Sequence, residues 1–433
     1  MRLKNRGGPG EAPPPPPFYE LTIDSVGAQG DGVATFKGGP VYIPYTLPGE
    51  RIRASLAGQR GRLITVIDPS PDRVSPPCPH FGTCGGCAVQ HMDATLHGQW
   101  KQDLLKAALG RRGIDAAVVA PVEAIPPGQR RRATFAYRHR ADGVILGFNA
   151  RQSDRIIDIA ACLLLLPPLT ELLSPLRTLL KAVTRPGETG EVTLSATFTG
   201  VDLVVTAPGP LDLDRRERLA AFAGVHDLAR VSWCGTTARG TAEPVAERRR
   251  PQACFAGVMV DLPPGCFLQP SAQGEAAIIA RILAAVGERS PVADLYAGVG
   301  SFTFSLAQHG RVHAVEGAKE ATLALRTAAQ RAGLDRITAL SRDLAAQPLE
   351  AAELRQFAAV VFDPPRAGAM AQARALAEGK DGPPLVVAVS CDPATLARDL
   401  RLLMNGGYRL KSVTPIDQFP WSPHLEAVAV LVR

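Results

Sequence analysis

The sequence predicts an α/β protein with a doubly wound parallel sheet in its C-terminal part, preceded by a small β-barrel and a mixed α+β segment. After Gly265, apolar strand-like runs alternate with helical stretches, a pattern typical of parallel sheets that helices cover on both faces. Before residue 70, short β-rich runs follow one another with turn residues between them. Strand and helix patterns are mixed in the stretch that joins these two regions.

Size and charge are compatible with two or three domains and an anionic partner. The chain has 433 residues, of which 46% are hydrophobic, so it can bury real cores. Lys and Arg number 48 against 41 Asp and Glu, a net charge of +7 that favours a polyanionic partner. The arginine clusters at 130–132 and 248–250 fit either phosphate recognition or a solvated loop, and the sequence leaves both interpretations open.

Targeting and membrane-spanning signals are not apparent in the sequence. The Gly/Pro-rich N-terminal stretch lacks the apolar core of a signal peptide. The longest apolar run, residues 159–166, is far too short to cross a bilayer. We therefore expect a cytoplasmic protein without membrane contact. In that reducing compartment, eight cysteines indicate a metal, a cluster or catalysis rather than disulfides.

The N-terminal part is predicted to be a tail followed by a barrel. Residues 1–17 form a Gly/Pro-rich tail that we expect to be disordered. Residues 18–70 contain five short β-rich runs, at 21–23, 33–36, 41–43, 50–54 and 62–66. Short strands at this density indicate an OB-like β-barrel, a fold that often binds nucleic acid.

Two further domains are expected after the barrel. Residues 71–262 form a mixed central domain, with a cysteine-rich segment at 78–91, helices at 96–110 and 169–183, and strands at 192–198 and 203–206. Residues 263–433 form the parallel-sheet domain, with strands at 292–296, 312–316, 337–340, 358–363 and 385–390.

A glycine pair marks a candidate ligand site at the edge of the parallel sheet. Gly298 and Gly300 follow the strand at 292–296 and precede a helix, where glycines let a ligand approach the backbone. Their spacing is not the Gly-x-Gly-x-x-Gly of dinucleotide-binding proteins. Acidic side chains lie at the ends of the next strands, at Glu316, Asp343 and Asp363. This set predicts a nucleoside pocket without a phosphate cradle and resembles class I S-adenosylmethionine-dependent methyltransferases more than NAD enzymes.

Cys391 lies just past a buried-looking strand and is a candidate nucleophile. Taken alone it would be interpreted as a small buried hydrophobe, as most free cysteines are. Methylation of uracil C5, however, needs a group that first attacks C6, and a thiolate is strongly nucleophilic and leaves again readily. A base must then remove the C5 proton. Glu426 is the best candidate for that base, and His424 is the alternative.

Three segments, at 363–368, 390–399 and 424–426, together resemble the RNA uracil-5-methyltransferase family. The resemblance extends over residues 18–433, and the motifs occur in family order. It implies a Rossmann-like class I methyltransferase domain with Cys391 as nucleophile and Glu426 as base. It also implies a set of cofactor contacts, formed by Gln269, Tyr296, Ser301, Glu316, Asp343 and Asp363.

A cysteine cluster precedes the first predicted helix. Cys78, Cys84 and Cys87 have the spacing C-x5-C-x2-C, and Cys162 is the candidate for a fourth ligand. Thiolates in this number suit zinc or an iron–sulfur cluster, and the spacing alone leaves both open. The segment resembles the [4Fe–4S] site of the ribosomal-RNA branch of the family. The resemblance implies a [4Fe–4S] cluster with a structural or RNA-shaping role.

The leading hypothesis is an enzyme that methylates C5 of a uridine in 23S rRNA. The barrel resembles a TRAM domain, and together with the cysteine cluster it favours this branch over the transfer-RNA branch. The alternatives are the same reaction on transfer RNA, amino-group methylation suggested by Asp363-Pro364-Pro365, and an RNA-binding iron–sulfur protein without activity. We expect RNA as the partner and a monomer as the oligomeric state.

Overall fold

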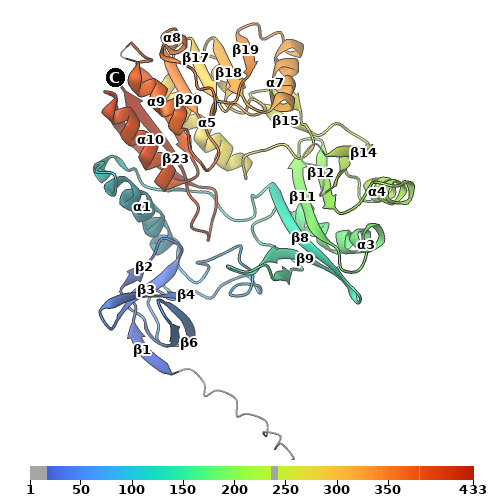
Figure 1. Cartoon of the computed structure of the whole chain (residues 1–433), viewed down its shortest axis with the longest axis vertical. Helices are drawn as coiled ribbons and strands as arrows, with labels where there is room; N and C mark the ends of the chain where they lie inside the picture. Colours follow the sequence, from blue (N-terminus) through green and yellow to red (C-terminus); the bar gives the residue numbers. More distant parts are fainter. Residues whose placement is uncertain (1–16, 236–241, 380) are drawn as a thin grey trace, which may run out of the picture. The chain divides into compact units, whose positions relative to one another are not determined.

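The computed structural model describes residues 17–235, 242–379 and 381–433, which fall into two compact units (Figure 1). Unit 1 comprises the residues up to 76 and residues 88–93, and unit 2 comprises residues 77–87 and 94–433. The tail predicted at 1–17 lies almost entirely outside the described residues. Within them, no helix is long and apolar enough to span a membrane. The domain boundaries predicted at residues 70 and 262 stay predictions.

Unit 1 is a small β unit built on a six-stranded sheet with the strand order β1-β5-β6-β4-β3-β2. Its strands are β1 (Phe18–Thr22), β2 (Ser25–Val26), β3 (Asp31–Phe36), β4 (Gly39–Pro44), β5 (Arg51–Ala57) and β6 (Arg60–Asp68). Along β5, the exposed Arg51 and Arg53 alternate with the buried Ile52 and Ala54, because successive side chains of a strand point to opposite faces. The predicted succession of short strands is confirmed.

The first part of unit 2 is built on a seven-stranded sheet with the order β10-β9-β8-β11-β12-β13-β14. Its strands are β8 (Arg132–Arg140), β9 (Gly143–Asn149), β10 (Ile156–Asp158), β11 (Thr189–Thr197), β12 (Gly200–Ala207), β13 (Arg230–Gly235) and β14 (Glu243–Glu247). Helices α2 (Pro167–Glu171), α3 (Leu173–Val183) and α4 (Leu213–Val225) belong to the same core. In α3, Leu173, Leu176 and Leu180 are spaced three or four residues apart, so they enter that core together.

The second part of unit 2 is an eight-stranded sheet with the order β19-β18-β17-β20-β21-β23-β22-β7. Its strands are β7 (Glu123–Ala124), β17 (Val292–Leu295), β18 (Val312–Glu316), β19 (Ile337–Ser341), β20 (Ala359–Phe362), β21 (Leu385–Ser390), β22 (Arg409–Asp417) and β23 (Glu426–Val432). Strands β17 to β21 pair in parallel, whereas β23 is antiparallel to both β21 and β22. All residues of β21 are buried, as in a strand covered on both faces.

Helices cover both faces of this sheet (Figure 1). They are α1 (Ala94–Gly110), α5 (Ala272–Val286), α6 (Thr303–Leu306), α7 (Lys319–Arg331), α8 (Ala351–Leu354), α9 (Met370–Glu378) and α10 (Pro393–Asn405). Val386 and Ala388 of β21 face the core that contains α10, whereas Val387 and Val389 face the core that contains α5. A short hairpin, β15 (Gln252–Phe255) and β16 (Val258–Asp261), and the 3-10 helix η1 (Ala116–Val118) complete the unit. The predicted α/β class, a Rossmann-like doubly wound sheet, is confirmed.

The topology brings several strand ends to one edge of the sheet. The chain runs from β17 through β18 to β19 on one side, then crosses to β20 and β21 on the other, so a topological switch point lies beside β17. Because β23 is antiparallel, it begins at the edge where β21 ends, and Ser390 pairs with Ala427. Ile416, near the end of β22, pairs with Glu426. Ligands of open α/β sheets bind at such an edge.

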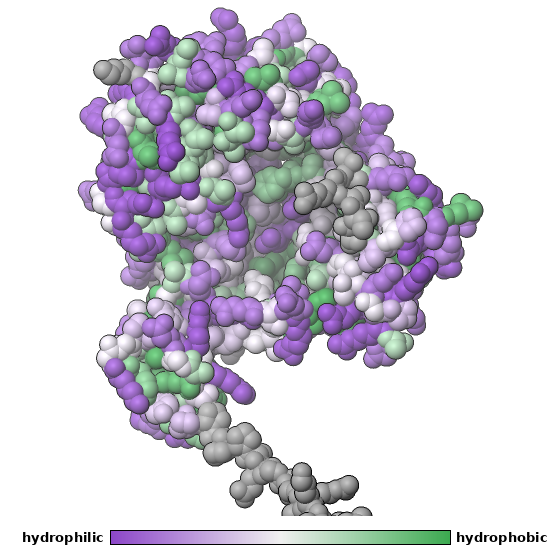
Figure 2. Space-filling model, viewed as in Figure 1, coloured by the Kyte–Doolittle hydropathy of each residue, from purple (hydrophilic) through white to green (hydrophobic). Residues whose placement is uncertain are grey.

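The face of the molecule drawn in Figure 2 carries mainly hydrophilic side chains, with apolar groups in small separate patches. Single exposed apolar residues such as Phe198 and Leu323 are common on protein surfaces. The edge of the sheet, rather than this surface, is therefore the candidate functional site.

Candidate active site

The turn after β17 has the backbone geometry of a ligand cradle. Tyr296, Gly298 and Gly300 all have positive φ angles, of 60°, 57° and 100°. A Cβ on Gly300 would lie 2.6 Å from the Phe304 ring, so only glycine fits there, whereas a Cβ on Gly298 would meet nothing within 4 Å. Tyr296 holds a conformation that costs energy for a residue with a side chain. At the switch point beside β17, the backbone at Gly298 is therefore accessible to a ligand.

The acidic residues predicted for the cofactor lie around this turn. Glu316 accepts hydrogen bonds from the backbone N–H of Gly298 at 2.9 Å and of Ala318 at 2.7 Å, which ties the end of β18 to the glycine turn. Each carboxylate oxygen keeps a second lone pair for a ligand hydroxyl. Asp343 is exposed and accepts from Ala345 N at 2.9 Å through Oδ1. These residues fit a nucleoside with ribose hydroxyls.

Tyr296 and Ser301 also border the turn, each with a half-buried side chain. Burial raises the pKa of Tyr296 to about 12, and the charges of Asp399, Asp343 and Glu316 add to that rise. The phenol therefore stays neutral and can serve as a hydrogen-bond donor. The predicted cofactor residues Tyr296, Glu316 and Asp343 are thus electrostatically close to one another.

Asp294, inside β17, is a buried acid to which the sequence analysis gave no role. Its Oδ2 accepts a hydrogen bond of 2.5 Å from Thr303 Oγ1, whereas Oδ1 is buried with no partner among the described residues. Burial raises the pKa of Asp294 to about 7, and the charges of Asp363 and Glu316 add to that rise. A buried carboxyl with one unused oxygen, next to a glycine turn, is typical of functional sites.

Four side chains from distant parts of the sequence form one hydrogen-bonded chain. Glu426 Oε2 accepts from Gln418 Nε2 at 3.0 Å, and the same nitrogen donates to Gln269 Oε1 at 3.0 Å. Gln269 Nε2 then donates to Asp363 Oδ2 at 2.8 Å. Three of these residues, Asp363, Glu426 and Gln269, were predicted as site residues, whereas Gln418 was not. These hydrogen bonds link the end of β20, the end of β22 and the start of β23.

The two carboxyl groups at the ends of this chain have raised pKa values. Burial raises the pKa of Asp363 to about 7, although the Gln269 hydrogen bond opposes the rise. Burial also raises the pKa of Glu426 well above its usual value, and the negative charge of Asp363 adds to the effect. Only 3% of Glu426 is exposed, and its Oε1 has no partner among the described residues. A buried carboxylate of this kind is suited to accept a proton.

Cys391 follows β21 directly and lies beside these carboxyl groups. Burial raises the pKa of Cys391 to about 11, and the charges of Glu426 and Asp363 raise it further, while Arg366 lowers it. The side chain is half-buried, so part of the thiol remains accessible. Helix α10 starts immediately after it, capped by Asp392, whose side chain accepts from Ala394 N and Thr395 N. The sulfur therefore sits at the start of a rigid element.

His424 lies close to Arg366 rather than to the buried carboxyls. A guanidinium nitrogen of Arg366 lies 2.9 Å from His424 Nε2. Burial lowers the pKa of His424 to about 4, and the positive charges of Arg366 and Lys101 lower it further. The imidazole is therefore neutral near pH 7 and is a weak proton acceptor. Its electrostatics favour Glu426 over His424 as the base.

A buried ion pair anchors the loop between β22 and β23. Lys101 of α1 is fully buried, and its Nζ donates to Asp417 Oδ1 at 2.7 Å, to Phe419 O at 3.2 Å and to His424 O. Burial lowers the pKa of Lys101, and the Asp417 carboxylate opposes that change. The loop held in this way carries Gln418. Sequence reasoning missed this contact because its partners lie 316 residues apart.

The two arginine clusters differ in what they contact. Arg131 donates to Gln269 O at 2.8 Å and pairs with Glu275 at 3.0 Å, so it supports the segment that carries Gln269. Arg248 and Arg249 are more exposed, and both pair with Asp227. The cluster at 130–132 is therefore part of the site's framework, and the cluster at 248–250 is a surface group with carboxylate partners.

The predicted cluster cysteines lie in one neighbourhood of unit 2. Burial raises the pKa of Cys162, and the charges of Cys84 and Cys78 add to that rise. Burial lowers the pKa of Arg130, and the charges of Cys162 and Cys87 oppose this. In the described part of the chain, however, no three His, Cys, Asp or Glu side chains form a group that could hold a metal ion. The geometry therefore identifies a cysteine neighbourhood and not a formed metal site.

Comparison with known proteins places these features in a family. A family model described as tRNA (uracil-5-)-methyltransferase matches residues 258–433. An uncharacterized RNA methyltransferase of Brucella suis biovar 1 is 45% identical over 417 residues, which cover 96% of this chain and 98% of that protein. The chain belongs to the RNA uracil-5-methyltransferase family. It is therefore an enzyme, an RNA methyltransferase that uses S-adenosylmethionine.

Two further proteins are similar to this chain, one in sequence and one in fold. The 23S rRNA (uracil(1939)-C(5))-methyltransferase RlmD of Chromohalobacter salexigens is 36% identical over 429 residues, covering 95% of this chain and 89% of that protein. The structure of Pyrococcus abyssi tRNA (uracil-54, C5)-methyltransferase with S-adenosyl-L-homocysteine has a TM-score of 0.71 and 23% identity, and covers 96% of this chain and 100% of that one. At this sequence identity, the similarity to the Pyrococcus abyssi structure shows a shared fold.

Proposed function

We propose that this enzyme transfers a methyl group from S-adenosylmethionine to C5 of a uridine in 23S rRNA, through a covalent bond between Cys391 and C6. The observation that carries this proposal is the convergence of Cys391, Asp363 and the buried carboxyl of Glu426 at one edge of the sheet. Similarity over almost the whole chain to a 23S rRNA methyltransferase supports ribosomal RNA as the substrate.

The residues suit a sequence of addition, transfer and elimination. Cys391 Sγ gives its proton to water and, as the thiolate, forms a bond to C6, which makes C5 electron-rich. When bound, S-adenosylmethionine supplies the methyl group that C5 then takes. Glu426 next removes the C5 proton, the electrons of that C–H bond restore the C5=C6 double bond, and the C6–S bond breaks to release the thiolate. Asp363 positions the ring or the cofactor at this edge.

The cofactor is proposed to lie over the glycine turn. Gln269, Tyr296, Ser301, Glu316, Asp343 and Asp363 would hold it. Support comes from Gly298, where a Cβ would meet nothing within 4 Å, so a ligand can approach the backbone there. The unpartnered Oδ1 of Asp294 adds a further acceptor in the same region.

We also propose that Cys78, Cys84, Cys87 and Cys162 bind a [4Fe–4S] cluster with a structural or RNA-shaping role. These four residues would supply the thiolate ligands that hold such a cluster. Their electrostatic effects support this grouping. The charges of Cys84 and Cys78 raise the pKa of Cys162, and those of Cys162 and Cys87 act on Arg130. Methyl transfer itself moves no electrons, so no redox role is assigned.

Unit 1 is proposed to act as a TRAM-like RNA-binding module. Lys37, in the turn between β3 and β4, and Arg62, on β6, are exposed, and neither has a carboxylate partner among the described residues. Aromatic side chains accompany the charges, since the Lys37 ammonium lies 5.4 Å from the centre of the Phe36 ring. Cations beside aromatic rings suit phosphates and unstacked bases.

The substrate is tested by offering RNA of both kinds. Purified enzyme with radiolabelled S-adenosylmethionine should label protein-free 23S rRNA at a single uridine and leave transfer RNA unlabelled. Label in transfer RNA and none in 23S rRNA would establish the alternative substrate with the same chemistry. No 5-methyluridine in either RNA, from enzyme that binds the cofactor, would contradict the proposed reaction.

A further inference from the structure

Gln418 is a member of the hydrogen-bonded chain that the reaction itself does not require. Its Nε2 donates to Glu426 Oε2 and to Gln269 Oε1, both at 3.0 Å, so both of its N–H bonds are used. We propose that Gln418 is the positioning residue of the general base: it holds Glu426 by Oε2 and leaves Oε1 as the oxygen that takes the C5 proton. This inference rests on the function proposed above.

The orientation of the amide follows from its neighbours. Asp363 can only accept a hydrogen bond when ionised, so Gln269 turns its NH2 toward Asp363 and its Oε1 toward Gln418. Gln418 then faces two acceptor oxygens, one from Gln269 and one from Glu426. The opposite orientation of the Gln418 amide would place its oxygen against both of them. In their ionised forms, Asp363 and Glu426 therefore fix the orientation of both amides.

Burial makes this contact decisive for the position of Glu426. Gln418 and Glu426 are each 3% exposed, so water cannot easily replace a lost hydrogen bond. Glu426 Oε1 is buried without a hydrogen-bond partner among the described residues. A buried polar atom is seldom left unpaired, because its desolvation is costly. A carboxylate held by one oxygen, with the other unpaired, is arranged to receive a proton from a bound molecule.

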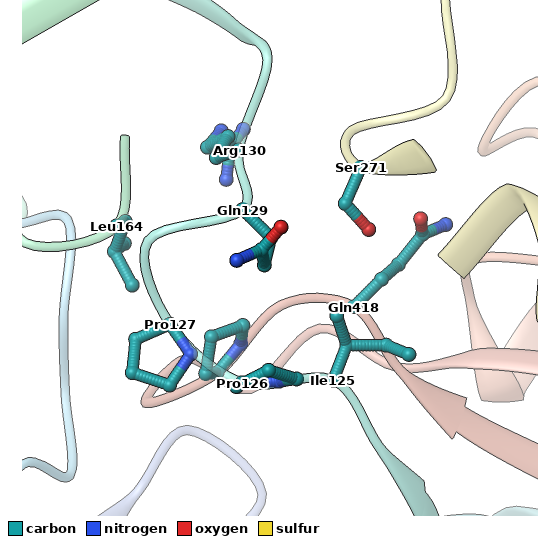
Figure 3. A pocket seen from close by; sticks show the side chains of 9 residues that line it. Ile125, Pro126, Pro127, Gln129, Arg130, Leu164, Ser271 and Gln418 are labelled. Carbon is teal, nitrogen blue, oxygen red and sulfur yellow. The ribbon is translucent and has the colours of Figure 1, made fainter. Parts of the chain in front are cut away.

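Gly274 shows that the fold keeps space for this glutamine. A Cβ on Gly274 would lie 2.5 Å from Oε1 and 2.8 Å from Cβ of Gln418. Gly274 lies in the first turn of α5, capped by Ser271, and alanine is normally preferred to glycine within helices. Figure 3 shows Gln418 beside the start of this helix, close to Ser271. Glycine at this position is explained by the room that Gln418 needs.

The proposal predicts a specific defect when Gln418 is changed. Addition of Cys391 to C6 and transfer of the methyl group precede the step that uses Glu426. In Gln418→Met, which keeps the bulk and removes both hydrogen bonds, the methylated protein–RNA adduct should therefore accumulate with ordinary uridine. Product release should slow roughly 100-fold, within the range of general-base contributions. Deuterium at C5 should slow the variant more than the wild type.

Two further variants make the test independent of folding defects. Gly274→Ala should give the same adduct by displacing Gln418, without changing any functional group. Gln129→Met alters a glutamine that lines the same small pocket as Gln418 (Figure 3) but is not part of the hydrogen-bonded set described above, so it should behave as wild type. The readouts are the adduct on denaturing gels and the C5-deuterium effect in single-turnover reactions.

The outcomes separate this inference from the proposed function. If Gln418→Met and Gly274→Ala release product as fast as Gln129→Met, Gln418 does not position the base. A uniform loss of activity in both, with no adduct and no deuterium effect, would also overturn the inference. Wild-type enzyme that forms no 5-methyluridine would instead refute the proposed function.

Discussion

Removal of the Lys101 ammonium should destabilise unit 2 strongly. Lys101→Met keeps the aliphatic length of the side chain and deletes its three hydrogen bonds, to Asp417, Phe419 and His424. The side chains of Lys101 and Asp417 are 0% and 3% exposed, so the variant leaves a carboxylate buried without its counter-charge.

The magnitude follows from this burial. Removing one partner of a buried ion pair costs about 3–5 kcal/mol. His97 supplies no counter-charge in the wild type: its Nδ1 is 3.7 Å from Asp417 Oδ2, but burial lowers the pKa of His97 to about 4, so the ring is neutral at pH 7. The Asp417 carboxylate keeps one backbone donor, Phe419 N at 3.1 Å. We therefore expect a loss of about 3–5 kcal/mol in the free energy of unfolding.

Tryptophan fluorescence during urea unfolding measures this loss. Trp100, Trp233 and Trp421 all belong to unit 2, so the signal reports that unit alone. The control is Arg218→Met, which breaks an exposed helical pair with Asp214 at 2.8 Å and should leave the free energy of unfolding nearly unchanged, because solvent screens that pair.

The double variant Lys101→Met/Asp417→Leu provides the decisive comparison. Because it removes both buried charges, it should be more stable than Lys101→Met alone. A loss below about 1 kcal/mol in Lys101→Met, or a double variant less stable than the single one, would refute the view that an uncompensated buried charge is the cause.

Three other predictions concern pH, the cluster and the framework of the site. Burial raises the pKa of Asp294 from 3.8 to about 7, so its stabilising contribution is complete below about pH 4 and is lost as the pH rises to 7. Asparagine does not ionise, so the free energy of unfolding of Asp294→Asn relative to wild type should increase by up to about 4 kcal/mol between pH 4 and pH 7. A difference that does not change with pH would contradict the raised pKa of Asp294. Anaerobically purified wild type should contain about four irons, and Cys162→Ser fewer, whereas one zinc per chain would exclude the cluster. Arg131→Met should raise the KM for S-adenosylmethionine, because Arg131 holds the segment of Gln269; an unchanged KM would remove that role.

Much of the fold was predictable because strand patterns and strand ends are local features. The strands at 312–316 and 385–390 have the predicted bounds, since their apolar runs are interrupted sharply by polar residues. Placement of Glu316 and Asp363 at one edge then followed from the rule that parallel strands end together.

The rest depended on contacts between distant segments. Gln418 follows β22 as one polar residue among several, and only the antiparallel pairing of β22 with β23 brings it to Glu426. A lysine on a helix is usually solvated, so nothing local marked Lys101 as buried. The arginine clusters looked alike in sequence, but one supports Gln269 and the other pairs with Asp227.

The most direct measurement of the central claim is the mass of a trapped adduct. RNA with 5-fluorouridine at the target position has no C5 proton for Glu426 to remove, so wild-type enzyme and S-adenosylmethionine should give a methylated adduct on the peptide that contains Cys391. Cys391→Ala should give none, whereas Cys266→Ala should match wild type, because burial raises the pKa of that thiol to about 12. Equal adduct in Cys391→Ala, or a bond to another residue, would contradict the assigned nucleophile.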